Sequence, residues 1–188
     1  MTRTTQRRDC PTETMARLVE SLKGADAQGI PRIEQLVEEF PDDPRLHFLL
    51  GSVLAGQRRY EEAHNAMRMA IDVAPDYALA RFQLGFLELT SGDPTSAEAT
   101  WGPLDQLVPG HPLRLFANGL RHLARDEFGP AVDLLRQGIA ANTELPEVNA
   151  DMQLIINKVT ESGDQPAGEA TSSTHMLLQQ YAARTTRH

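Results

Sequence analysis

Residues 44–143 repeat with a period of 34 positions, and this period is the strongest constraint on the fold. Small residues and prolines recur at matching sites, namely Gly51, Gly85 and Gly119, Ala63, Ala97 and Ala131, and Pro75 and Pro109. A fixed period of about 20 to 50 residues is typical of a solenoid, in which each unit buries its apolar face only against its neighbours. The period therefore predicts a stack of similar units and narrows the functions that the chain can have.

The spacing inside one repeat predicts a helical hairpin, because two helices of about a dozen residues and two short connections fill such a repeat. In the first repeat each predicted helix carries an apolar stripe, formed by Leu46, Leu50 and Leu54 on the first helix and by Ala63, Met67, Ala70 and Ile71 on the second. Glycine and alanine at the recurring sites let the two backbones approach closely. Proline closes each unit, since it cannot continue a helix.

At these positions the chain resembles the tetratricopeptide repeat family. The family's Leu-Gly step is matched by Leu50-Gly51 and Leu84-Gly85, and its second-helix alanine is matched by the recurring alanines. The resemblance implies an all-α fold, a right-handed superhelix of three clear repeats. The third copy departs from the pattern, because Asn118 replaces the leucine and Thr143 replaces the closing proline. Gly138 disfavours a helix in the same copy, so we expect its second helix to be the weakest.

The same period predicts the domain boundaries. Counting back, Gly29, Ile33, Leu36 and Pro41 fall in register with the later repeats and predict a degenerate leading repeat. The predicted array, residues 10–161, comprises the leading repeat at 10–43, full repeats at 44–77, 78–111 and 112–145, and a closing helix at 146–160. Residues 1–9 are predicted to be a disordered basic N-terminus, 162–174 a flexible linker, and 175–188 a short amphipathic tail.

Composition argues against several classes of protein. Once the array is assigned, too few residues remain for a catalytic domain. No two histidines have the spacing of helical metal ligands, and no glycine-rich loop has the pattern of a phosphate site. We therefore expect no enzyme activity, no cofactor and no metal site. The one cysteine, Cys10, is expected to be a free thiol near a mobile end.

The ends and the charge of the chain bear on its location and partners. No secretory signal or membrane-spanning stretch is present, so a cytoplasmic location without membrane insertion is expected. The excess of arginine over lysine, 16 to 2, is typical of a GC-rich bacterial genome. Acidic residues outnumber basic ones by 26 to 18, and five of the arginines lie near the ends. An array of this charge repels nucleic acid, so a nucleic-acid partner is not expected.

The predicted binding site is an apolar groove on the first helices of the repeats, which line the concave side of the superhelix in this family. Phenylalanine recurs at the fifth position of each repeat. The predicted groove comprises Phe48, Leu79, Phe82, Phe86, Leu113, Phe116 and Leu120, with Arg45, Arg81 and Arg114 on the rim to steer acidic residues of a partner. A stripe at helical spacing is also typical of a core, so both interpretations stay open at this stage.

Two specialisations within the family can be compared with these positions. Chaperone-docking members hold a terminal carboxylate with lysine, asparagine and arginine. The matching positions here, Phe48, Ser52, Gln83, Leu113 and Ala117, carry no positive charge, which argues against such a clamp. The layout of the chain is also similar to the small acidic chaperones of type III secretion translocators, although no motif is diagnostic of them.

The tail contains apolar residues that cluster on one side of a short helix, namely Met176, Leu177, Leu178 and Tyr181. Three interpretations stay open: a lid on the chain's own groove, a contact that makes a homodimer, or a disordered end. The predicted function is an adaptor, scaffold or chaperone-like module that binds a peptide or helix of a partner protein. The alternative is an assembly subunit that oligomerises through the swapped tail or through end surfaces such as those of Phe128 and Ile139.

Overall fold

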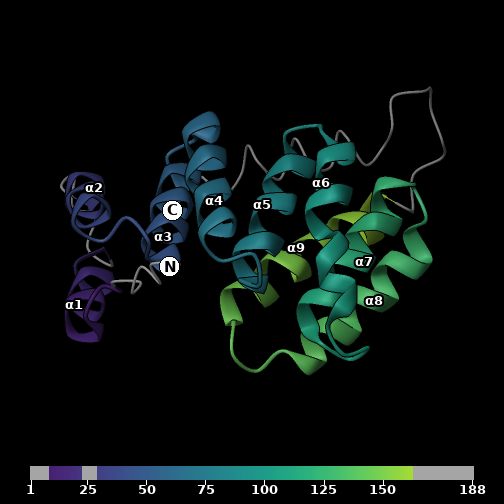
Figure 1. Ribbon diagram of the computed structural model, residues 1–188. Helices are drawn as coiled ribbons and strands as arrows, with labels where there is room; N and C mark the ends of the chain where they lie inside the picture. The colour runs from purple at the N-terminus through teal and green to yellow at the C-terminus, as the bar shows by residue number, and fades with distance from the viewer. Residues whose placement is uncertain (1–8, 23–28, 163–188) are drawn as a thin grey trace, which may run out of the picture. The chain divides into compact units, whose positions relative to one another are not determined.

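The computed structural model describes residues 9–22 and 29–162, and the regular structure in these residues is helical throughout (Figure 1). The elements are α1 (Thr12–Leu22), α2 (Gly29–Glu39), α3 (Pro44–Gly56), α4 (Tyr60–Val73), α5 (Ala78–Thr90), α6 (Pro94–Trp101), the 3-10 helix η1 (Gly102–Gln106), α7 (Pro112–Ala124), α8 (Phe128–Ala141) and α9 (Pro146–Ser162). The prediction of an all-α fold built from consecutive hairpins is confirmed. The predicted N-terminus, linker and tail fall outside the described residues, apart from Asp9 and Ser162.

The chain divides into two compact units, residues 1–80 and 81–188, which are described separately. In the first unit, α1, α2 and α3 enclose a core of Cys10, Leu18, Ile33, Phe40 and Leu46, and α4 packs against α3. In the second unit, α6 to α9 pack in chain order. Its core includes Trp101, Phe82, Phe116, Leu120 and Leu135, whose side chains are almost fully buried.

The recurring glycines lie where the two helices of a hairpin come closest. A Cβ atom on Gly51 would lie 3.1 Å from the carbonyl oxygen of Ala63, and one on Gly119 would lie 3.2 Å from that of Ala131. These are the alanines that recur with the glycines in the sequence. The prediction that glycine and alanine permit close helix packing is therefore confirmed at both hairpins.

The turn inside each hairpin also repeats. Arg58, Gly92 and Asp126 lie 34 positions apart and all have a positive φ, between 58° and 89°. In each turn the amide of the third residue after the helix end donates to a carbonyl five positions earlier, as Arg59 N–H does to Leu54 C=O at 3.0 Å. This is the Schellman arrangement, which needs a left-handed residue at the turn. Arginine and aspartate adopt that backbone less readily than glycine.

Two second helices differ from a simple repeat. Helix α6 has only 8 residues and continues as η1, because Pro103 has no amide hydrogen to extend the helix. In contrast, α8 runs for 14 residues, through Gly138. A Cβ atom on Gly138 would lie 2.4 Å from the ring of Phe116. The glycine makes room for this ring. The prediction that α8 would be the weakest second helix rested on helix propensity alone and left out this packing.

Candidate functional site

The residues of the predicted groove fall into two groups. Phe48 and Leu79, both in the first unit, are half-buried. The other five belong to the second unit and are buried, with exposed fractions of 7% or less: Phe82, Phe86, Leu113, Phe116 and Leu120. The expectation that these five line an exposed groove is therefore wrong.

Aromatic packing explains much of this burial. The ring of Phe82 stacks on Phe86 and on Trp101, with ring centroids 6.3 and 6.4 Å apart, and its centroid lies 6.0 Å from that of Phe116. Trp101 comes from α6, and its indole N–H donates to the carbonyl oxygen of Phe82 at 3.0 Å. Gly85 leaves the space for this indole, since a Cβ atom there would lie 2.3 Å from its nitrogen. The face of α5 that carries Phe82 is thus part of the core.

The three arginines of the predicted rim make contacts within their own unit. Arg45 forms an ion pair with Asp43, with Nη2 2.6 Å from Oδ2. Arg81 Nη1 donates to the carbonyl oxygen of Thr100 at 3.3 Å, and Arg114 Nη1 donates to that of Leu107 at 2.6 Å. These hydrogen bonds assign the three guanidinium groups a structural role that the sequence pattern did not indicate.

An aromatic pair remains accessible in the first unit. Phe48 on α3 and Tyr77, which precedes α5, are both half-buried, and their ring centroids lie 5.5 Å apart at an interplanar angle of 59°. Burial raises the pKa of the Tyr77 hydroxyl, so this hydroxyl is neutral at physiological pH. The pair offers an apolar surface with one polar group.

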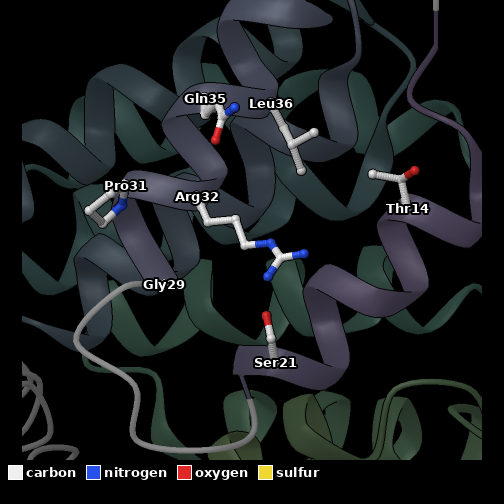
Figure 2. Close-up of a pocket in the computed structure, with 7 residues that line it drawn as sticks. All are labelled: Thr14, Ser21, Gly29, Pro31, Arg32, Gln35 and Leu36. Atoms are coloured by element: carbon white, nitrogen blue, oxygen red, sulfur yellow. The ribbon is translucent and has the colours of Figure 1, made fainter.

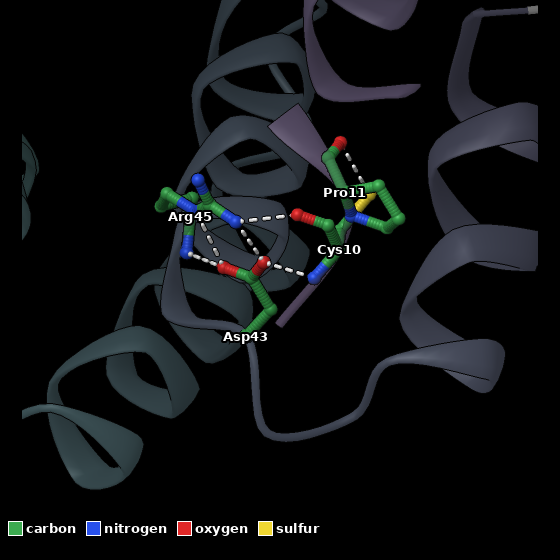
Figure 3. A network of polar contacts seen from close by, with 4 residues as sticks. All are labelled: Cys10, Pro11, Asp43 and Arg45. Carbon is green, nitrogen blue, oxygen red and sulfur yellow. Dashed lines mark hydrogen bonds and ion pairs between the residues drawn. The ribbon is translucent and has the colours of Figure 1, made fainter. Parts of the chain in front are cut away.

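A polar network fastens the start of the described chain to α3 (Figure 3). Asp43 is the N-cap residue of α3, as expected for an acidic residue at a helix start, and it is buried. Its carboxylate accepts hydrogen bonds from the backbone amides of Cys10 and Arg45, at 2.8 and 3.0 Å, and from the Arg45 guanidinium. The Arg45 guanidinium also donates to the carbonyl oxygen of Cys10 at 2.8 Å. We call these three residues the N-terminal clamp.

The clamp corrects the expectation for Cys10. Its thiol is free, as expected, but its side chain is 2% exposed and belongs to the core of the first unit. Burial raises the pKa of the thiol, and the nearby Asp43 carboxylate raises it further. A thiol that is both buried and protonated reacts slowly, since the thiolate is the nucleophile. Cys10 is therefore a packing residue.

The clamp predicts acid sensitivity of the first unit. Burial alone would raise the pKa of Asp43, but the hydrogen bonds from Arg45 and Cys10 together hold it below the ordinary value of 3.8. A carboxylate with a lowered folded-state pKa stabilises the fold above its unfolded pKa of about 3.9, and this stabilisation is lost as pH falls through the folded value. We expect the difference in unfolding free energy between wild type and Asp43→Asn to shrink from about pH 5 to about pH 2, as measured by urea unfolding. A constant difference across this range would contradict the assignment.

A pocket of about 480 Å³ lies between α1 and α2. Figure 2 shows Thr14 and Ser21 on α1, facing Arg32 and Gln35 on α2. The Arg32 side chain extends between the two helices toward Ser21, whose hydroxyl donates to the carbonyl oxygen of Leu18 at 2.7 Å. Polar and apolar side chains line this pocket in similar measure.

A second recess of about 460 Å³, which we call the α6–α7 cleft, lies wholly in the second unit. The residues that line it are Leu89, Pro94, Thr95, Glu98, Ala99, Trp101, Arg121, Ala124 and Arg125. Arg121 is almost buried and joins three elements, because it donates to Glu98 on α6 at 3.1 Å, to Asp105 on η1 at 2.8 Å and to Asn118 on α7 at 2.7 Å. Most of its lining residues come from α6, the second helix of one hairpin, and from the C-terminal end of α7, the first helix of the next. The repeat pattern compares equivalent positions of the hairpins and therefore did not predict this cleft.

Other predicted features are easily placed. Phe128 and Ile139, proposed as an end surface, are half-buried on α8. Among the described residues, no cluster of three histidine, cysteine or acidic side chains is arranged to hold a metal ion. No described helix has the length and apolar character that crossing a bilayer requires.

Comparisons with known proteins agree with the helical-hairpin architecture. The model of the tetratricopeptide repeat family matches residues 27–63 and 48–102. Tetratricopeptide repeat protein 34 from Homo sapiens is 37% identical over 73 residues, which make up 38% of this chain. These residues are 13% of that protein, so the chain spans only a small part of its length.

Two solved structures share the fold. MamA from Desulfovibrio magneticus RS-1, residue 41 to the end, superposes with a TM-score of 0.58, covering 92% of this chain and 91% of that one. A double mutant of MamA from RS-1 also has a TM-score of 0.58, with 93% of each chain covered. Both are 12% identical to this chain, a level at which the likeness concerns the fold alone.

Proposed function

Because residues 27–102 match the model of the tetratricopeptide repeat family, we propose that this chain works by binding a segment of a partner protein. Arrays of this repeat are generally protein–protein interaction modules and are usually non-catalytic. The function is then association, and its energy comes from burying apolar surface on a rigid helical scaffold.

The contact surface in this proposal consists of Phe48, Tyr77 and Leu79. The observation that carries it is that these apolar side chains are half-buried, whereas the predicted groove residues of the second unit belong to its core. Aromatic residues dominate the energetics of many interfaces, because they bury a large area at a small cost in conformational entropy. A half-exposed aromatic pair therefore suits an apolar side chain of a partner.

The partner segment is an extended or helical peptide with an apolar anchor and a neighbouring acidic residue. Arg45 is the reason for including an acidic residue in the partner, because 41% of the Arg45 side chain stays exposed despite its ion pair with Asp43. An exposed charge of this kind chiefly steers association and orientation and adds little affinity.

The proposal predicts that Phe48→Ala weakens partner binding by at least about tenfold, which corresponds to about 1.4 kcal/mol. Proteins captured from cells by the intact chain would first be identified, and the affinity of each purified partner would then be measured by calorimetry. Met69→Ala is the matched control, since Met69 is an exposed apolar residue of the same unit, on α4. Both variants must keep the helical content of the wild type.

Unchanged affinity of every captured partner for Phe48→Ala would rule out this surface. The assembly alternative predicts a different pattern, in which substitutions at Phe128 or Ile139 alter the oligomeric mass and Phe48→Ala leaves it unchanged. Light scattering on the same variants separates the two functions.

A further inference from the structure

The pocket between α1 and α2, which the surface proposed for the partner protein does not use, has walls that the core holds in place. Its volume of about 480 Å³ is in the range of about 300 to 1,000 Å³ that small-molecule sites occupy. Leu18 on α1 and Ile33 on α2 anchor the two helices, since both side chains have an exposed fraction of 0%. At Gly29 the helices come so close that a Cβ atom would lie 2.6 Å from Cδ2 of Leu22. The pocket is therefore preformed.

The lining of this pocket is positively charged. Arg32 contributes a guanidinium group, whereas none of the described residues that line the pocket has a carboxylate. Glu13, which precedes the lining residue Thr14, forms an ion pair with Arg17. The chain as a whole has a net charge of −8, but exposed charges farther away than about 8 Å are largely screened at physiological ionic strength. A small anion is therefore complementary to the pocket, whereas a long polyanion is still repelled by the rest of the chain.

Three polar side chains of the pocket have unused hydrogen-bond donors. Within the part of the chain that the structure describes, the side chains of Thr14, Arg32 and Gln35 make no hydrogen bond and no ion pair. Figure 2 shows the Arg32 guanidinium extending from α2 between the helices, with Thr14 on the α1 wall. A hydroxyl, an amide and a guanidinium group can all donate, so a ligand with several acceptor oxygens satisfies donors on both helices at once.

A phosphate monoester suits these donors better than a carboxylate does. A carboxylate has two oxygens, which the fork of one arginine satisfies by itself. A phosphate monoester has three terminal oxygens and a charge of about −1.5 to −2 at pH 7, so it accepts from Arg32 and still offers an oxygen to neutral donors. Pro31 and Leu36, which also line the pocket, provide apolar surface for an organic group.

We propose that the pocket between α1 and α2 binds a small molecule with a phosphate monoester group. Arg32 and Gln35 on α2 and Thr14 on α1 hold the phosphate, and the organic part lies against Pro31 and Leu36. Arg32 supplies the charge, and the two neutral donors orient the phosphate. A ligand that contacts both helices also stabilises the leading hairpin, because it binds only the folded state. The site is separate from the surface assigned to the partner protein, so either can exist without the other.

The test is an NMR titration of the full chain, labelled with ¹⁵N-arginine, with phenyl phosphate at constant ionic strength. We expect the side-chain N–H signal of Arg32 to shift and to saturate, with a dissociation constant on the order of 1 mM. Benzoate has the same ring but carries a carboxylate, and inorganic phosphate lacks the ring. Each should bind at least about threefold more weakly than phenyl phosphate, since each lacks one of the two recognised groups.

Three variants assign the binding to the pocket. Arg32→Gln should weaken phenyl phosphate binding at least about tenfold, and the fold should be retained because Arg32 is exposed. Thr14→Val keeps the shape of the side chain but removes the hydroxyl, and it should weaken binding about threefold. Arg136→Gln is the matched control, because Arg136 is an exposed arginine on α8 in the other unit. It removes the same charge and should leave the affinity unchanged.

Each of four outcomes would overturn the inference. The absence of a saturable shift at Arg32 would mean that no such site exists. Benzoate or inorganic phosphate that binds as tightly as phenyl phosphate would show that the pocket does not select a phosphate monoester. An equal loss of affinity in Arg136→Gln would indicate a general effect of charge. Full affinity of Thr14→Val would mean that Arg32 attracts anions at the surface and that the pocket is not the site.

Discussion

Replacing Trp101 with alanine is expected to lower the free energy of unfolding by about 3 to 5 kcal/mol. The side chain is 1% exposed, stacks on Phe82 and donates its indole N–H to the carbonyl oxygen of that residue. The substitution removes the packing, leaves a cavity and deletes the hydrogen bond together. Urea unfolding followed by circular dichroism would measure the change.

Gly85 provides an internal check on this prediction. Alanine at this position would place a Cβ atom 2.3 Å from the indole nitrogen of Trp101, and such overpacking costs about 1 to 3 kcal/mol. Once Trp101 is alanine, the obstruction is gone, and Gly85→Ala should then be close to neutral. The double-mutant cycle should show a coupling of at least about 1 kcal/mol. Additive effects would mean that the indole does not pack over Gly85.

The repeat explains why so much of the fold is predictable. The recurring glycines and alanines specify where helices touch, and the contacts of Gly51 with Ala63 and of Gly119 with Ala131 have the expected form. Turn geometry is less visible, since only Gly92 reveals a left-handed backbone that Arg58 and Asp126 share. Equivalent positions of the repeat keep the same backbone conformation even where the residue type in one copy does not indicate that conformation.

The exposure of the apolar stripe is harder to predict, because helical periodicity tells which residues share a face and not what covers that face. Phe82 and Phe116 recur at one repeat position, yet their rings meet at 6.0 Å in the core. The covering group is Trp101, a single residue that departs from the pattern of the other repeats. Likewise the sequence pattern predicts Arg45 as a rim charge and does not show that its ion pair with Asp43 also makes it part of the clamp.

The N-terminal clamp should make Asp43 more sensitive to substitution than Asp93, the N-cap residue of α6. We expect Asp43→Ala to lower the free energy of unfolding by about 2 to 4 kcal/mol. The substitution removes the cap of α3 and leaves the buried amide of Cys10 without its acceptor. It should also loosen the segment around Cys10, so that a thiol reagent labels this cysteine at least about tenfold faster than in the wild type.

Asp93→Ala is the matched control, because Asp93 is also an N-cap followed by proline, and its carboxylate accepts from the amide of Ser96 at 3.0 Å. Asp93 is exposed, so its loss should cost about 1 kcal/mol, the ordinary value of a cap, without changing the labelling of Cys10. The excess cost of Asp43→Ala then measures the long-range part of the clamp. If both substitutions cost the same and Cys10 stays protected in both, Asp43 acts only as a local cap, and the link between Cys10 and α3 contributes nothing to stability.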